Sequence, residues 1–243
     1  MARYHLIACN VLWREFCYFA ALSPNQISFH FLRQGLHNTP ELLREELQAA
    51  VDAADAAEMP RYDAILLGYG LCCSGLTGLQ ARRTRLVAIR AHDCITILLG
   101  SKERYQEYFA QHPGTYWYSP GWIEQTAMPG RERFEALRRK YREKYDEEEA
   151  EYLLQYETDW VTKYNQATYV DVGVGDSEGH AAFTRECADW LGWKSEVLRG
   201  DPRLIMGLLN GPWNPEDFLV VEPGQQIKPS YDTRIITTDN SQE

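Results

Sequence analysis

The sequence predicts an α/β protein with a Rossmann-like, mainly parallel sheet in two lobes that a long helix connects. Three observations favour this class. Apolar, β-branched runs alternate with helical patterns along the chain, as in βαβ units. The run 62–69 is nearly all apolar, which is typical of a central parallel strand covered on both faces. The length of 243 residues suits one large α/β domain or two small lobes.

The first lobe is predicted at residues 1–125. Strands are expected at 4–12, 27–32, 62–69 and 85–91, and helices at 13–22 and 40–57. Thr39 is a favourable N-cap for the second helix, with Pro40 in its first turn. The aromatic, turn-rich segment 113–122 could form a wall or lid over a pocket, and a role in packing the lobes together is an equal alternative.

The middle of the chain, 126–164, changes character. Fifteen of the 21 residues from Arg131 to Glu151 are charged, and aromatic residues recur at helical spacing through Trp160. We interpret this segment as one long helix, or two, with a solvated charged face. Its aromatic stripe is predicted to pack against the sheet, in preference to forming a partner surface.

The second lobe is predicted at 165–243. Strands are expected at 167–172, 195–198 and 218–222, and helices at 178–191 and 201–210. The polar tail from Ser230 is expected to fray.

Composition excludes several classes of protein. The 25 basic and 35 acidic side chains give a net charge of −10, which argues against a nucleic-acid binder. No apolar run approaches the ~20 residues of a membrane span, and no secretion signal is expected in the first 16 residues because their apolar run is too short. Six cysteines are too few for a disulfide scaffold of this length, so reduced thiols and a cytoplasmic location are expected.

Three cysteines follow the ends of predicted strands. Cys9 ends the first strand, Cys72 follows the 62–69 strand, and Cys94 follows the 85–91 strand. The carboxyl ends of parallel strands meet at one edge of a sheet, where ligands bind in open α/β folds. Three thiolates with an open fourth position are typical of a catalytic metal site. We therefore predict Cys9, Cys72 and Cys94 as ligands of an iron–sulfur cluster or of zinc.

Other residues at this predicted edge could complete the site. His92 and His37 are candidate acid/base groups, and His92 is also a candidate fourth ligand. Gly70 and Gly75 belong to a glycine-rich loop whose N–H groups could contact the cofactor, and Asp93 lies beside it. The glycine pairs at 68–70 and 173–175 do not complete a phosphate-binding motif.

The remaining cysteines are less informative. Cys17 and Cys187 fall within predicted helices and are expected in the core, and Cys73 could be a spare ligand or a redox partner. A buried cysteine often acts only as a small hydrophobe, which would leave a plain small-molecule binding domain. Arg90 and Lys102 could hold an anionic group, and ordinary surface pairing explains them equally well.

Several segments resemble an uncharacterised bacterial and archaeal domain family. They are LIACNVL, QGLHN, YDAILLGYGLCCSGLTGL, RAHDCITILLGSKERY and PGTYWYSPGWIE, over residues 5–124. Members of this family are often found near corrinoid-dependent methyltransferase systems. The resemblance implies a role in methyl or one-carbon metabolism, with a small-molecule substrate or a corrinoid or methyltransferase protein as partner. The leading hypothesis is a metal-dependent enzyme, and the alternative is a non-catalytic accessory protein that holds a metal or corrinoid.

Overall fold

The computed structural model describes residues 1–56, 61–72 and 74–238. The chain divides into two units. Unit 1 comprises Met1–Tyr105 and Gly200–Glu243, and unit 2 comprises Gln106–Arg199. Unit 1 is therefore built from both ends of the sequence, with unit 2 inserted between them.

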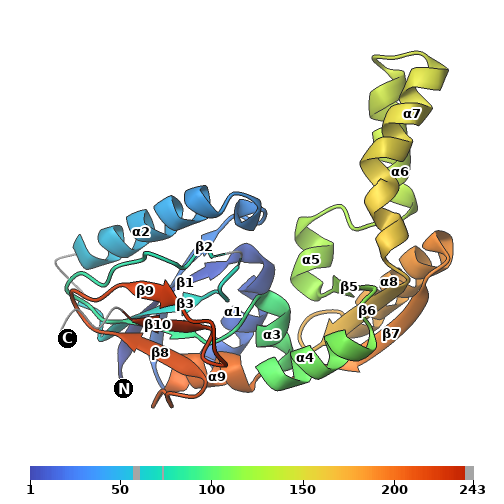
Figure 1. Cartoon of the computed structure of the whole chain (residues 1–243). Helices are drawn as coiled ribbons and strands as arrows, with labels where there is room; N and C mark the ends of the chain where they lie inside the picture. Colours follow the sequence, from blue (N-terminus) through green and yellow to red (C-terminus); the bar gives the residue numbers. More distant parts are fainter. Residues whose placement is uncertain (57–60, 73, 239–243) are drawn as a thin grey trace. The chain divides into compact units, whose positions relative to one another are not determined.

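Unit 1 contains a five-stranded, mainly parallel sheet, as expected of an α/β protein. The strand order is β2-β1-β3-β4-β8 (Figure 1). β8 alone runs antiparallel, paired with β4. The strands are β1 (Arg3–Cys9), β2 (Gln26–Leu32), β3 (Ala64–Gly68), β4 (Leu86–Ile89) and β8 (Phe218–Val221). Every residue of β3 and β4 is buried, which explains why their sequences are continuous apolar runs.

Helices cover both faces of this sheet (Figure 1). On one face, the amphipathic helix α2 (Pro40–Ala56) packs Leu43 and Leu47 into the core with Ile65 and Leu67 of β3. On the other lie α1 (Trp13–Ala21) and α9 (Arg203–Asn210), which contact one another. Short helices follow three of the strands. They are the 3₁₀ helices η1 (Asn10–Leu12) and η2 (Leu36–Asn38), and α3 (Cys94–Leu99).

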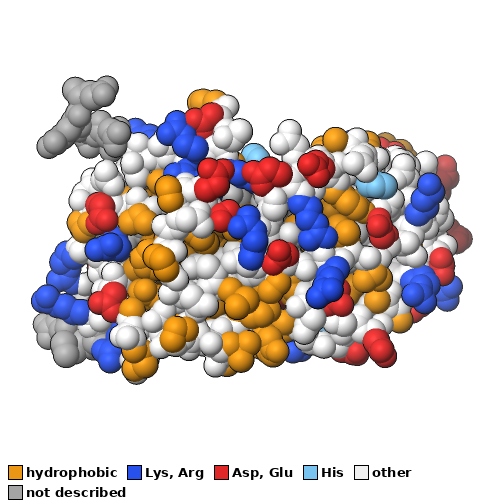
Figure 2. Space-filling model, turned by 90° about the horizontal axis from the view of Figure 1, so that it is seen from below, with side chains coloured by type: hydrophobic (Ala, Val, Ile, Leu, Met, Phe, Trp, Pro, Cys, Tyr) orange, Lys and Arg blue, Asp and Glu red, His pale blue; other side chains and the backbone are white. Residues whose placement is uncertain are grey.

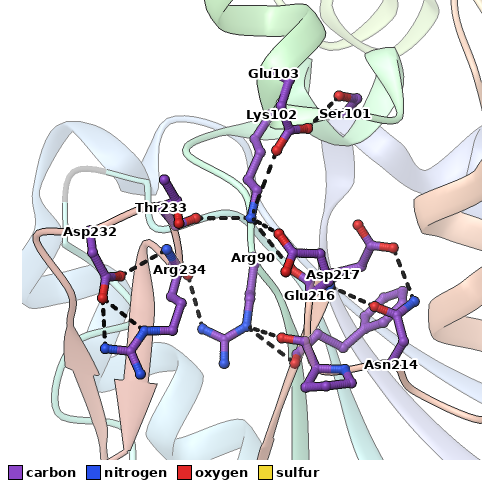
Figure 3. A network of polar contacts seen from close by, with 12 residues as sticks. Arg90, Ser101, Lys102, Glu103, Asn214, Glu216, Asp217, Asp232, Thr233 and Arg234 are labelled. Atoms are coloured by element: carbon purple, nitrogen blue, oxygen red, sulfur yellow. Dashed lines mark hydrogen bonds and ion pairs between the residues drawn. The ribbon is translucent and has the colours of Figure 1, made fainter.

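A hairpin of β9 (Ile227–Pro229) and β10 (Ile236–Thr238) closes unit 1, so the expectation of a fraying tail is wrong up to Thr238. Arg90 holds it in place (Figure 3). This buried guanidinium donates to the carbonyls of Pro215 (2.9 Å) and Arg234 (3.0 Å), and also to that of Ile236. Because its donors are directed at backbone oxygens, Arg90 is a structural clamp rather than an anion ligand.

Unit 2 contains a three-stranded parallel sheet of order β5-β6-β7. Its strands are β5 (Thr115–Tyr118), β6 (Gln166–Asp171) and β7 (Lys194–Arg199), and its helices include α5 (Pro120–Gln125) and α8 (Ser177–Leu191). The helix α4 (Lys102–Gln111) begins in unit 1 and ends in unit 2. Segment 113–122 is not a turn-rich lid: it forms β5 and the start of α5, and Tyr118 is fully buried.

The charged middle segment folds into two helices and a 3₁₀ turn. These are α6 (Arg131–Arg142), α7 (Glu147–Thr158) and η3 (Asp159–Lys163), so a single long helix is excluded. The prediction that the aromatic stripe packs against the sheet is wrong for its central members. Tyr145, Tyr152 and Tyr156 are 45%, 68% and 76% exposed.

The predicted division at 1–125, 126–164 and 165–243 differs from the two units. β5, expected in the first lobe, belongs to the sheet of unit 2, and β8, expected in the second, pairs with β4 of unit 1. Among the described residues, no helix has the length and apolar character needed to cross a membrane. On the face in Figure 2, side chains of both charges surround hydrophobic patches, so the acidic balance does not give a uniformly acidic surface there.

Candidate functional site

The candidate site lies where the order of strands in unit 1 reverses. β1 lies between β2 and β3. The connection from β1 to β2 runs through α1, and that from β2 to β3 runs through α2 on the opposite face. In open α/β sheets such a switch point leaves a crevice outside the carboxyl ends of the strands. Cys9 ends β1 and Tyr69 follows β3, so both border this point.

Two thiols gather around Tyr69. Cys9 and Cys72 both pack against the core on the α2 side of the sheet, where Tyr69 is only 3% exposed. Burial raises the pKa of the Tyr69 hydroxyl, and the neighbouring thiols of Cys9 and Cys72 raise it further. The hydroxyl oxygen is buried, and among the described residues it has no hydrogen-bond partner of standard geometry. The structure therefore brings two of the three predicted ligands together around a phenol.

The Cys9 thiol is protonated at neutral pH. Burial raises its pKa, and the Val11 backbone and the nearby Tyr69 hydroxyl, which both stabilise the thiolate, offset part of this effect. The thiolate is the nucleophilic form, so a raised pKa makes Cys9 a weak nucleophile. A coordinating metal ion, in contrast, deprotonates a thiol outright.

The loop after β3 runs beside the loop after β4. The Leu71 N–H donates to the Ala91 carbonyl (2.8 Å), and the Cys72 N–H donates to the His92 carbonyl (3.0 Å). Gly70 permits this approach because a Cβ there would lie 2.6 Å from the Asp93 nitrogen. A Cβ at the other predicted glycine, Gly75, would lie 2.3 Å from Cδ2 of Leu43. Gly70 is thus required for the close approach of the two loops, whereas a side chain at Gly75 would displace the end of the Leu43 side chain.

The loop also holds non-glycine residues in the left-handed region. Cys72 has φ of 44° and Ser74 has φ of 72°. Such conformations cost of order 1–3 kcal/mol and cluster at ligand sites. Cys73, between them, lies outside the described residues.

Asp93 and Cys94 form a second group, at the start of α3. Asp93 caps this helix, accepting from the backbone N–H (2.9 Å) and the hydroxyl (3.0 Å) of Thr96. Burial raises the pKa of Tyr105. The Asp93 carboxylate, through its charge and a hydrogen bond, and the nearby Cys94 raise this pKa further. Asp93 is thus engaged in capping, and Cys94 shares its surroundings with Tyr105.

The predicted histidines occupy the same edge of the sheet. His37 lies in η2, directly after β2, and burial lowers its pKa, so the imidazole is neutral at pH 7. His92 contributes its backbone carbonyl to Cys72. Of the cysteines predicted in the core, Cys187 is 5% exposed, as expected, and Cys17 is half-buried on α1.

Within residues 1–56, 61–72 and 74–238, no group of three or more His, Cys, Asp or Glu side chains is arranged to hold a metal ion. Of the three predicted ligands, Cys9 and Cys72 lie around Tyr69, and Cys94 lies apart from them, beside Tyr105. The described arrangement therefore does not form a complete metal centre as it stands.

Sequence reasoning missed three groups at this edge. Tyr69 and Tyr105 carry no motif and are indistinguishable from core aromatic residues in the sequence. Glu15 is fully buried in the first turn of α1, just beyond Cys9. An acidic residue among apolar ones at the start of a helix that follows a strand was the available signal for Glu15.

The family profile described as "Protein of unknown function (DUF1638)" matches residues 31–209, more than half of the chain. The chain belongs to this family. The match includes Cys72, Cys94, His37 and His92 and begins after Cys9. Comparisons with curated proteins and with solved structures found no match. The family thus supplies no reaction, and any function must be argued from the site.

Proposed function

We propose that unit 1 binds a thiophilic metal, as an iron–sulfur cluster or as zinc, through Cys9, Cys72 and Cys94 at the carboxyl edge of its sheet. One observation carries the proposal: Cys9 and Cys72, 63 positions apart in sequence, both pack against the core cluster that contains the buried Tyr69. They flank the switch point of a sheet whose order and two-sided helices resemble a Rossmann-like lobe. Thiolates are the ligands that iron–sulfur clusters and zinc prefer.

Metal loading requires a change in the loop after β3, because two thiols are one fewer than an open catalytic site uses. The backbone N–H of Cys72 is bonded to the carbonyl of His92, two residues before Cys94. Relaxing the left-handed backbone at Cys72 and Ser74 would let the Cys72 thiol reposition relative to Cys94.

The raised pKa of Cys9 argues against nucleophilic attack by this thiol, whereas a bound metal would deprotonate it. A non-catalytic accessory protein, which holds a metal or corrinoid for a methyltransferase, is the second candidate. It agrees with the family resemblance noted from residues 5–124. Under the enzyme hypothesis, His92 or His37 would act as the acid/base group on a small-molecule substrate.

The test is anaerobic purification of the full chain, followed by quantification of iron, sulfide and zinc and by a visible spectrum. We expect stoichiometric metal in the wild type and its loss in Cys9→Ser, Cys72→Ser and Cys94→Ser. Cys17→Ser is the matched control, since this thiol lies on α1 of the same unit and should leave metal content unchanged. A metal-free wild type after reconstitution, or full occupancy in all three variants, would overturn the proposal.

A second measurement separates the two roles. The metal-loaded chain is incubated with cobalamin alone, and with a methyl donor together with cob(I)alamin as the methyl acceptor. A shift of the corrinoid spectrum without turnover supports the accessory role, and multiple turnovers without a partner protein support the enzyme. If the protein shows neither a spectral shift nor turnover, both roles in methyl metabolism are contradicted.

A further inference from the structure

The helical hairpin formed by α6 and α7 in unit 2 has little core of its own. The two helices run side by side (Figure 1) and contact one another more than any other element. α6 has no buried residue, and α7 buries only Ala150 and Leu154. Most helical stability in proteins comes from packing of an apolar face, so two helices that share so small a core are short of burial.

The outer face of α7 carries large aromatic side chains. Tyr152 and Tyr156 are one turn apart and are 68% and 76% exposed. Tyr145, in the turn between the helices, is 45% exposed. Tyrosine is enriched at protein interfaces because it combines a large apolar ring with a polar group.

Charge is segregated between the two arms of the hairpin. Residues 131–144 contain seven Lys or Arg and three Asp or Glu, whereas residues 146–159 contain seven Asp or Glu and no Lys or Arg. Some of this charge is neutralised inside the hairpin, where Arg138 binds Glu151 (2.9 Å) and Arg142 binds Glu147 (2.9 Å). The outer faces keep the remainder, with Arg139 and Lys140 exposed on α6 and Glu148 and Glu149 exposed on α7.

We propose that this hairpin is a homodimerisation surface whose occupant is the same hairpin of a second copy of the chain. A basic arm beside an acidic arm is self-complementary under a two-fold axis, since α6 of each copy then faces α7 of the other. The two hairpins form a four-helix bundle, the smallest common arrangement that gives such helices a shared core.

The spacing of side chains fits this pairing. Ala136, Arg139 and Lys140 share one face of α6, at i, i+3 and i+4, and all three are exposed. In the two-fold arrangement, α7 of the second copy runs antiparallel to α6, as α7 does within the hairpin. The small side chain of Ala136 leaves room for a tyrosine ring, and Arg139 can stack on Tyr152 of the second copy. Glu148 and Glu149 of the second copy then face Arg139 and Lys140.

Charge reversal tests this surface with the full-length protein. We expect the wild type to sediment as a dimer that dissociates as salt is raised. The variants R139E/K140E and E148K/E149K each place like charges across both halves of the interface, so each should weaken dimerisation about 100-fold or more. An equimolar mixture of the two should restore the dimer, because both contacts become complementary again. R185E/K194E, at exposed positions of unit 2, has the same change in net charge as R139E/K140E; it is the control for that variant and should stay dimeric.

Circular dichroism checks that each variant is folded. If a double variant loses helix, Tyr152→Asp serves in its place, since this exposed side chain contributes little to the monomer. A wild type that is monomeric at all concentrations would overturn the proposal. So would charge-reversed variants that remain dimeric, or folded variants whose mixture fails to form a dimer. These outcomes are independent of metal content and leave the proposed thiol site untouched.

Discussion

The Tyr69 hydroxyl gives a prediction in which the sign of the effect is decisive. Tyr69→Phe removes a buried oxygen that has no hydrogen-bond partner of standard geometry among the described residues. A buried hydroxyl without a compensating hydrogen bond costs about 1–3 kcal/mol, whereas an ordinary neutral hydrogen bond contributes about 0.5–1.5 kcal/mol. We therefore expect the free energy of unfolding of the metal-free protein to stay unchanged or to rise by up to about 2 kcal/mol.

The assay is urea unfolding of the reduced protein, with Tyr105→Phe as the matched comparison in the same unit. Tyr105 bonds the Asp93 carboxylate, and loss of a bond to a charged group should lower the free energy of unfolding by about 1.5–3 kcal/mol. In Tyr69→Phe, the pKa of Cys9 should also rise, because Tyr69 lowers it. Alkylation of Cys9 at pH 8, followed by peptide mapping, should then be slower. A loss of 1 kcal/mol or more in Tyr69→Phe, or faster alkylation of Cys9, refutes this account of the thiol site.

Three other substitutions test the packing and polar contacts of unit 1. Gly70→Ala places a Cβ 2.6 Å from the Asp93 backbone nitrogen and should lower the free energy of unfolding by about 2 kcal/mol or more. Gly173→Ala is the control, because the space around it is open, and should cost about 1 kcal/mol. Equal losses of stability in thermal unfolding would contradict this. Arg90→Met leaves its carbonyl partners unsatisfied, so we expect a loss of about 3 kcal/mol and rapid proteolysis within 225–238, and unchanged protease resistance would exclude the clamp. Burial opposes ionisation of Asp217, but its hydrogen bonds, chiefly from Arg203, hold its pKa below the usual 3.8. The stability it contributes is therefore fully present above that pH and lost as pH falls through the lower folded pKa. Asp217→Asn should cost about 1 kcal/mol at pH 7, and a gap to wild type that persists at the acid limit of the folded range would argue against linkage.

The parts of the fold that sequence predicts well are those whose pattern is complete within one segment. Residues 62–69 are almost uniformly apolar, and the strand β3 lies at their centre. The helix predicted at 178–191 matches α8 within a residue. Local sequence patterns do not predict which strand another strand pairs with, or in which direction. The run at 218–222 is clearly a strand, but nothing in it specifies an antiparallel pairing with β4, more than 120 positions earlier.

The candidate site divides in the same way. Strand ends place Cys9 and Cys72 at one edge from sequence alone, and the structure brings both to Tyr69. The separation of Cys94 into a group with Tyr105 depends on how two loops pack, which sequence spacing does not encode. The aromatic stripe failed as a core prediction because helical periodicity shows which residues share a face and not whether anything covers it.

Unit 1 is built from two separate stretches of the chain, and this fixes the order in which its strands can assemble during synthesis. Until β8 has emerged from the ribosome, the β4 edge of the sheet has no strand to accept its backbone hydrogen bonds, and an open edge invites pairing with other chains. All of unit 2 is made during this interval. A fragment limited to the family match at 31–209 would lack β1, most of β2, and β8, which leaves only β3 and β4 complete in the five-stranded sheet. Expression of such a fragment should therefore give aggregated protein, and biochemical work on this family needs the flanking segments.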